Sequence, residues 1–196
     1  MREFKTGARL NKIIEAAKRR QHSLRVVMEN IHDPHNVSAI LRTCDAVGIS
    51  KVSLVYNVEK FPKINRTSSA SAVKWVEREK FSDIKVCYEN LRSQGFKIYA
   101  SSLTEHSISL YDIDFTQKTA IVLGNEHRGV SSEAAELADD VFLIPMHGMV
   151  QSLNVSVANA VILYEAQRQR LINGMYDRTE LNEEEIDKFI DEWCKK

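Results

Sequence analysis

The regular alternation of short apolar runs with amphipathic segments is the feature that most limits how this 196-residue chain can fold. The apolar runs have the length of β-strands and lie at 24–28, 52–56, 97–101, 119–123 and 141–144. Helical patterns fall between and after them, at about 34–47, 83–93, 132–138 and 152–171. Strands that alternate with helices predict an α/β fold whose sheet is mainly parallel.

The composition supports one globular domain with small appendages. The chain is 43% hydrophobic and 28% charged, which excludes collagen-like, low-complexity and wholly disordered classes. The segment 155–163 is apolar nearly all round, so we expect that part of the last core helix to be buried. No apolar run is long enough for a membrane span, and the charged N-terminus predicts no secretory signal. Three cysteines without framework spacing indicate reduced thiols in a cytoplasmic protein.

The two ends of the chain carry opposite charge, although the formal net charge is zero. Residues 1–25 hold eight basic and two acidic side chains, whereas residues 177–196 hold four basic and eight acidic ones. A neutral total argues against a protein that binds nucleic acid by bulk charge, but it allows a local basic patch. The two ends therefore either do different jobs or attract each other. We divide the chain into an arm at 1–22, a core at 23–172 and an extension at 173–196.

Both ends have the apolar spacing of helices. Leu10, Ile13, Ile14 and Ala17 give this spacing in the arm, which is either a solvated amphipathic helix or a cationic surface for a phosphate backbone. Asn182 is the expected N-cap of the second helix. Three glutamates follow it and complement the helix dipole, so we interpret their acidity first as helix stabilisation.

Two loops after predicted strands have unusual compositions. The loop 124–129 reads Gly-Asn-Glu-His-Arg-Gly, where glycines allow a close approach to a ligand, but an ordinary tight turn is the alternative. Its glycine spacing is neither that of a dinucleotide site nor that of a P-loop. The loop after 141–144 leads into Ser-Leu-Asn at 152–154, and capping explains only one of these polar groups. Ligands of α/β proteins bind at such strand ends, so both loops are candidate sites.

A third polar feature lies on the first core helix. Asn36 and Arg42 are six residues apart, about 120° off one helical face, and Arg42 points away from the apolar stripe. Taken alone, Arg42 is most simply a solvated arginine. His32, Asp33 and His35 offer too few ligands for a metal site, so no metal is predicted.

Together, three segments resemble the motifs of a known superfamily, in order and at similar spacing. They read NVSAILRTCDAVG (36–48), IVLGNEHRGVS (121–131) and IPMHGMVQSLNVSVANA (144–160). The superfamily is that of the SPOUT RNA methyltransferases, and the chain is similar to its TrmH group, the tRNA guanosine 2′-O-methyltransferases. The resemblance implies a deep trefoil knot over about 120–165, terminal helices beside the core, and a homodimer with active sites near its interface.

The resemblance also implies a cofactor and the residues that bind it. The cofactor is S-adenosylmethionine, and the residues expected to line its pocket are Ser101, Leu123, Gly124, Ile144, Met146 and Leu153. The residues expected to contact RNA are Arg9, Arg20, Arg168, Arg170 and Arg178.

The reaction that the resemblance implies is attack of a ribose 2′-oxygen on the cofactor methyl group. The catalytic residues expected from it are Asn36, Arg42, Glu126, Ser152 and Asn154. Because an arginine almost never loses its proton in a protein, we expect Arg42 to bind the adjacent phosphate and the developing oxyanion. Glu126, Ser152 and Asn154 are expected to hold Arg42 and the cofactor in place, and Asn36 is expected to orient the arginine or the RNA.

The expected substrate is guanosine 18 in the D loop of tRNA, because the chain lacks the extra N-terminal domain of ribosomal-RNA members. The alternatives are a ribosomal-RNA 2′-O-methyltransferase of the same fold and a catalytically silent RNA-binding module. One departure is the segment 66–73, RTSSASAV, which has no glycine where related sequences often have one.

Overall fold

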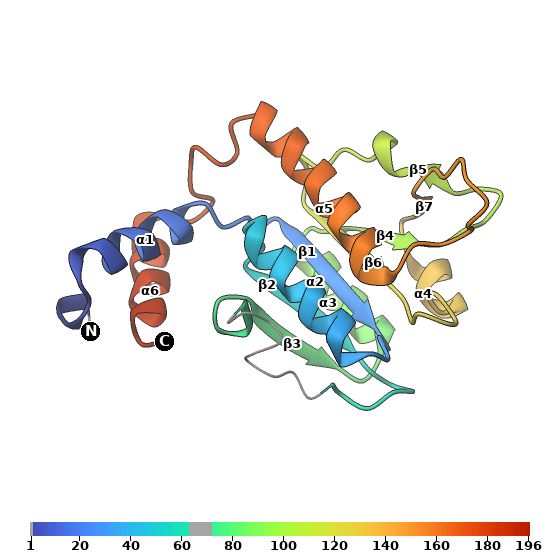
Figure 1. Ribbon diagram of the computed structural model, residues 1–196, viewed down its shortest axis with the longest axis horizontal. Coiled ribbons are helices and arrows are strands. Elements are labelled where there is room, and N and C mark those ends of the chain that lie inside the picture. The colour runs from blue at the N-terminus through green and yellow to red at the C-terminus, as the bar shows by residue number, and fades with distance from the viewer. Residues whose placement is uncertain (1, 63–71) are drawn as a thin grey trace.

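A computed structural model describes residues 2–62 and 72–196, and these residues form one seven-stranded sheet (Figure 1). The strand order is β3-β2-β1-β6-β4-β7-β5, and every neighbouring pair is parallel. The strands are β1 Leu24–Glu29, β2 Lys51–Val55, β3 Glu77–Phe81, β4 Lys97–Ser101, β5 Ile108–Ser109, β6 Thr119–Leu123 and β7 Asp140–Leu143. The predicted α/β fold with a parallel sheet is therefore confirmed.

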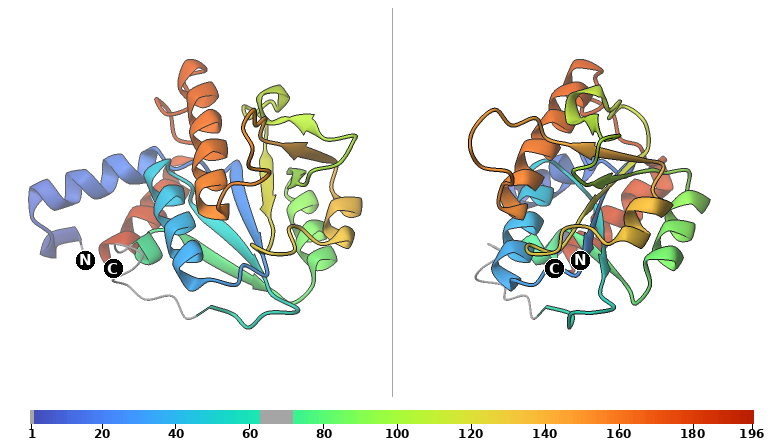
Figure 2. Two further views of the ribbon diagram at one scale, coloured as in Figure 1. Left: turned by 45° about the vertical axis from the view of Figure 1, so that its right-hand side comes forward. Right: turned by 90° about the vertical axis from the view of Figure 1, so that its right-hand side faces the viewer.

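Helices cover both faces of the sheet, as parallel strands require. The α-helices among the described residues are α1 Gly7–Lys18, α2 Pro34–Ala46, α3 Ile84–Ser93, α4 Ser132–Leu137, α5 Val155–Ile172 and α6 Glu183–Cys194. Figure 2 shows α2 and α5 on one face of the sheet and α3 and α4 on the other. No helix among the described residues is long and apolar enough to cross a membrane.

The core consists of two apolar layers that share the central strands. All residues of β1 and β6 are buried, and successive side chains point to opposite faces. Met28 packs with α2 and α5, whereas Val27 packs with α3 and α4. Each fully buried side chain of this kind contributes roughly 1.5–3 kcal/mol, so the central strands fix the positions of the loops at their ends.

The two ends of the chain pack against each other, which is one of the two outcomes that their charges predicted. Figure 1 shows α1 beside α6, away from the centre of the sheet. Ile13 and Ala17 of α1 meet Ile190 and Trp193 of α6 in a small apolar cluster. Arg2 adds ion pairs to Asp187 and Asp191 at 3.1 and 2.7 Å. The division at residues 22 and 172 stays a prediction, but the arm and the extension form one helical pair.

Several local expectations were wrong. β3 was not predicted, because its sequence Glu-Arg-Glu-Lys-Phe is charged, and β5 has only two residues. α5 begins at Val155 rather than at Ser152, because Asn154 is its N-cap. The helix is also not buried all round, since the side chain of Val157 is 49% exposed.

The strand order does not test two further expectations, one on the knot and one on the segment 66–73. The trefoil knot over about residues 120–165 stays a prediction. Of the glycine-free segment 66–73, residues 66–71 lie outside the described part of the chain.

Candidate active site

A cavity of about 180 Å³ opens at the carboxyl ends of β4 and β7. Four of the six residues expected to bind the cofactor line it, namely Ser101, Ile144, Met146 and Leu153. Its walls are largely apolar, and main-chain groups from two strand ends border it. These properties suit a heterocyclic base held by main-chain groups.

The other two expected cofactor residues do not line this cavity. Leu123 is 1% exposed and belongs to the core. Gly124 is required by its own loop, because a Cβ atom there would overlap the main chain of Gly129 and Val130. Asn125 and Gly129 exchange two main-chain hydrogen bonds of 3.0 and 2.8 Å. The two glycines therefore form a tight turn, which was the simpler of the two interpretations of this loop.

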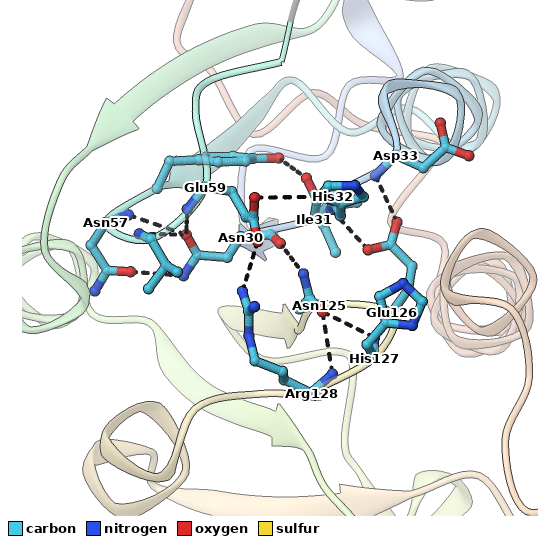
Figure 3. A network of polar contacts seen from close by, with 12 residues as sticks. Asn30, Ile31, His32, Asp33, Asn57, Glu59, Asn125, Glu126, His127 and Arg128 are labelled. Atoms are coloured by element: carbon cyan, nitrogen blue, oxygen red, sulfur yellow. Dashed lines mark hydrogen bonds and ion pairs between the residues drawn. The ribbon is translucent and has the colours of Figure 1, made fainter.

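The carboxylate of Glu126 is the centre of a polar network at the ends of β1 and β6 (Figure 3). It accepts hydrogen bonds from the amides of His32 and Asp33 at 2.8 and 3.1 Å, and from Asn36 Nδ2 at 2.8 Å. Partial burial alone would raise the pKa of Glu126, but these hydrogen bonds outweigh it and lower the pKa below its ordinary value. Glu126 therefore stays ionised at neutral pH.

Asn36 extends the network to the start of α5. Its Oδ1 accepts a hydrogen bond of 3.2 Å from Asn154 Nδ2. The side chain of Asn154 also caps α5 by accepting from the Ser156 amide at 2.9 Å. Three of the predicted catalytic residues, Glu126, Asn36 and Asn154, thus lie together. They border a second cavity of about 470 Å³.

Ser152 and Arg42 stand apart from this network. Ser152 lines the smaller, apolar cavity with Leu153. Arg42 is exposed on α2, roughly 9 Å along the helix axis from Asn36, and no described residue forms a hydrogen bond or ion pair with it. Its guanidinium is therefore available to an anion, and the expectation that Glu126 or Asn154 holds it directly is not met in this structure.

Two asparagines that the sequence analysis did not single out position the loops around Glu126. Asn30 has a positive φ of 50°, and its Oδ1 accepts from the amides of Asn57, Val58 and Glu59, each at 3.1 Å. Asn125 Nδ2 donates to the Asn30 carbonyl at 2.8 Å. Asn30 directly follows buried β1, and Asn125 follows buried β6 after one glycine. A polar residue at a strand end was the signal that could have identified them.

Asn125 also organises the turn that follows it. Its Oδ1 accepts from the amides of His127 and Arg128 at 3.0 and 3.2 Å. Arg128 then reaches Glu59 through an ion pair of 3.0 Å. The loops after β1, β2 and β6 are thus joined by side-chain hydrogen bonds, as Figure 3 shows.

The five arginines expected to contact RNA divide into two groups. Arg9, Arg168 and Arg178 are exposed. Arg20 and Arg170 are only 3% and 0% exposed, which contradicts a direct phosphate contact in this structure.

The two buried arginines have structural partners instead. Arg20 donates to the Ile49 carbonyl at 2.8 Å and forms an ion pair with Asp45. Arg170 donates to the main-chain carbonyls of Phe115, Ser23 and Gln117, at 2.8, 3.1 and 3.2 Å. Helical periodicity could not reveal these long-range partners.

The parallel sheet and its paired strand-end cavities define the class of protein, an α/β protein with its candidate site at the carboxyl ends of the strands. The chain belongs to the SpoU rRNA Methylase family, whose sequence profile matches residues 23–164.

Similar proteins span the whole chain. A tRNA (guanosine(18)-2′-O)-methyltransferase of Thermus thermophilus is 48% identical over 196 residues, covering 100% of both chains. The relative of the same name from Escherichia coli K12 is 45% identical over 170 residues, covering 87% of this chain and 74% of its own. The crystal structure of an Aquifex aeolicus TrmH/SpoU tRNA modifying enzyme superposes with a TM-score of 0.90 and 44% identity, covering 96% and 95%.

A more distant structure contains a cofactor. It is the SpoU methyltransferase AviRb from Streptomyces viridochromogenes in complex with AdoMet, with a TM-score of 0.68 and 27% identity. The match covers 79% of this chain and 62% of that one.

Proposed function

We propose that this protein transfers a methyl group from S-adenosylmethionine to the ribose 2′-hydroxyl of guanosine 18 in tRNA. The observation that carries the proposal is the position of residues 152–154 between the two cavities. Ser152 and Leu153 line the apolar cavity, and Asn154 lines the polar one. A methyl donor in the first cavity and a nucleoside in the second would therefore meet across a single short segment.

The apolar cavity fits the adenosine end of the cofactor. Ile144, Met146 and Leu153 supply apolar contact, while the strand ends supply main-chain donors and acceptors. The cofactor contributes an electrophilic methyl group. No group of His, Cys, Asp and Glu among the described residues has the arrangement of a metal site, and we expect the reaction to proceed in excess chelator.

The protein side of the reaction is mainly electrostatic. Glu126 is ionised and engaged by three donors, so it positions Asn36 and the loop after β1 rather than acting as a base. Arg42 has a permanent positive charge and no partner among the described residues, so it can bind the substrate phosphate and the developing 2′-oxyanion. The 2′-hydroxyl proton would pass to a solvent water molecule, because a protonated guanidinium cannot accept it.

The choice of tRNA over ribosomal RNA rests on the sequence identity to each relative. The Thermus thermophilus tRNA enzyme is 48% identical over 196 residues. A 23S rRNA (guanosine-2′-O-)-methyltransferase of Xanthomonas campestris is 36% identical over 165 residues. We therefore place the substrate in tRNA, and the enzyme in the cytoplasm, where tRNA is available.

Methylation of unfractionated tRNA with labelled S-adenosylmethionine tests the proposal. Nuclease digestion and mass mapping are expected to place the methyl group on the ribose of guanosine 18. A tRNA transcript in which this nucleotide carries a 2′-deoxyribose is the matched control and should receive no label. Labelling of ribosomal RNA alone would favour the ribosomal alternative, and absence of labelling together with RNA binding would favour the silent module.

We also propose that the protein is a homodimer that buries one face of α5. Val157, Tyr164 and Leu171 are spaced by seven residues on this helix and are 49%, 55% and 55% exposed. A spacing of seven keeps them on one face, and an apolar stripe in contact with water is typical of an interface between copies. Light scattering after gel filtration should give twice the 22.4 kDa chain mass, and Tyr164→Glu should shift the protein toward the monomer.

A further inference from the structure

The polar cavity has two exposed imidazole rings at its mouth that the roles described above do not use. His32 and His127 line the cavity together with Asn36 and Asn154. The ring centroids are 6.4 Å apart and the ring planes are inclined by 56°, so the rings form a tilted pair within the distance of an aromatic contact. Both residues are exposed, and the His32 side chain retains 63% of its accessible surface.

The backbone beneath each ring is held in place. The His32 amide donates to Glu126, and the His127 amide donates to Asn125. The His32 ring has one further contact, between Nδ1 and Glu59 Oε2 at 3.3 Å, and no described residue hydrogen-bonds the His127 ring. Figure 3 shows both histidines on the loops that the asparagine network joins. The rings are therefore fixed at their bases, while their faces remain accessible.

The position of the two rings relative to the reacting atoms limits what they can touch. On the proposed function, the ribose 2′-oxygen must approach the apolar cavity across residues 152–154. The base on the same ribose then extends into the polar cavity, whose volume of about 470 Å³ is in the range of small-ligand sites. Unpaired bases are commonly held by stacking on aromatic rings, including imidazole.

We propose that the exposed ring faces of His32 and His127, together called the stacking slot, bind the base of the methylated nucleotide. The inference rests on the proposed function and extends it, because it assigns the contacts of the base rather than those of the ribose. Every base has a π-face, so this slot provides affinity for an extruded base but little choice among bases. Discrimination of guanine then falls to hydrogen-bonding groups elsewhere in the site.

The test compares binding of two tRNA transcripts, one intact and one with an abasic nucleotide at position 18. His32→Ala and His127→Ala should each weaken binding of the intact transcript on the order of tenfold. The same variants should bind the abasic transcript within about twofold of the wild type, because the partner of the ring is absent. His127→Phe should keep the wild-type affinity, since it retains an aromatic face. His35→Ala is the matched control, because His35 is exposed on the same segment but does not line the cavity.

The outcomes separate this inference from the proposed function. Product mapping with the wild-type enzyme decides the proposed function before any variant is compared. If the wild type methylates guanosine 18, equal losses on both transcripts, no loss on either, or failure of His127→Phe to restore affinity would each overturn the stacking slot. Unchanged S-adenosylmethionine affinity and thermal unfolding of the variants show that any loss is local.

Discussion

Replacement of Glu126 by alanine separates the positioning role of this carboxylate from a role in proton transfer. The substitution removes the acceptor of three hydrogen bonds, from the amides of His32 and Asp33 and from Asn36 Nδ2. Asn36 Nδ2 then loses its acceptor, so the Asn36 amide group is free to rotate. Its hydrogen bond with Asn154 is weakened as a result. The loops after β1 and β6 also lose their direct connection through this side chain.

The magnitude follows from the number and type of these bonds. A hydrogen bond to a charged acceptor contributes about 1.5–3 kcal/mol when it is shielded from water. The Glu126 side chain is only partly buried, so water replaces part of this, and we expect Glu126→Ala to lower the free energy of unfolding by about 2–3 kcal/mol in total. Glu126→Gln should cost less, because its carbonyl oxygen still accepts, although its NH₂ group faces a donor.

The pH dependence provides an independent measurement. The pKa of Glu126 is lowered in the folded protein below its ordinary value of 4.5, so its stabilising contribution is present above that value. It is lost as the pH falls through the lower, folded-state pKa. Urea denaturation at a series of pH values should therefore show that the stability difference between wild type and Glu126→Gln shrinks below about pH 4.5. A constant difference down to pH 2 would refute the assignment of an ionised, hydrogen-bonded carboxylate.

Three further predictions concern other residues. Arg42→Ala should change stability by no more than about 0.5 kcal/mol, yet slow single-turnover methylation on the order of 100-fold or more. Arg42→Lys should also be poor, and Arg78→Ala is the exposed control; an alanine variant within about threefold of wild type would contradict the role of Arg42. Arg170→Ala should cost about 3–5 kcal/mol in chemical denaturation, because it strands buried carbonyls, and an unchanged midpoint would show that water replaces the guanidinium. Cys44 and Cys87 should react with a thiol reagent only on unfolding, since both are buried and burial raises the pKa of the Cys87 thiol to about 12.

The sheet and its helices could be predicted from the sequence because their apolar residues follow the strand and helix periods. Two strands were missed: β5 has only two residues, and β3 has no such pattern. Lys51 binds Glu77 and Glu79 of β3 through ion pairs, and Arg25 binds Glu79 as well. Ion pairs with nearby strands therefore stabilise β3 in place of apolar burial. The residue pattern of one segment cannot predict such pairs, because they depend on which strand lies beside it.

The candidate loops were predictable because they follow strands, whereas the individual site residues were predicted from the resemblance to known motifs. Asn36, Glu126 and Asn154 were predicted and lie together, while the catalytic roles themselves stay predictions. The burial of Arg170 was not predicted, because a charged residue on a helix normally faces solvent. Its partners Ser23 and Gln117 are far away in the sequence, and they become its neighbours only through the order of the strands.

The outer strands of the sheet also have a consequence for handling the protein at high concentration. β3 presents four charged side chains in five residues, and β5 is two residues long. A strand from another molecule that pairs with β3 would have to desolvate these charges. A strand that pairs with β5 would gain too few main-chain hydrogen bonds for a stable contact. Fibrillar, cross-β association of the native protein is thereby disfavoured. Reversible assembly must use helical surfaces, where it leaves the main-chain ladder of each sheet intact.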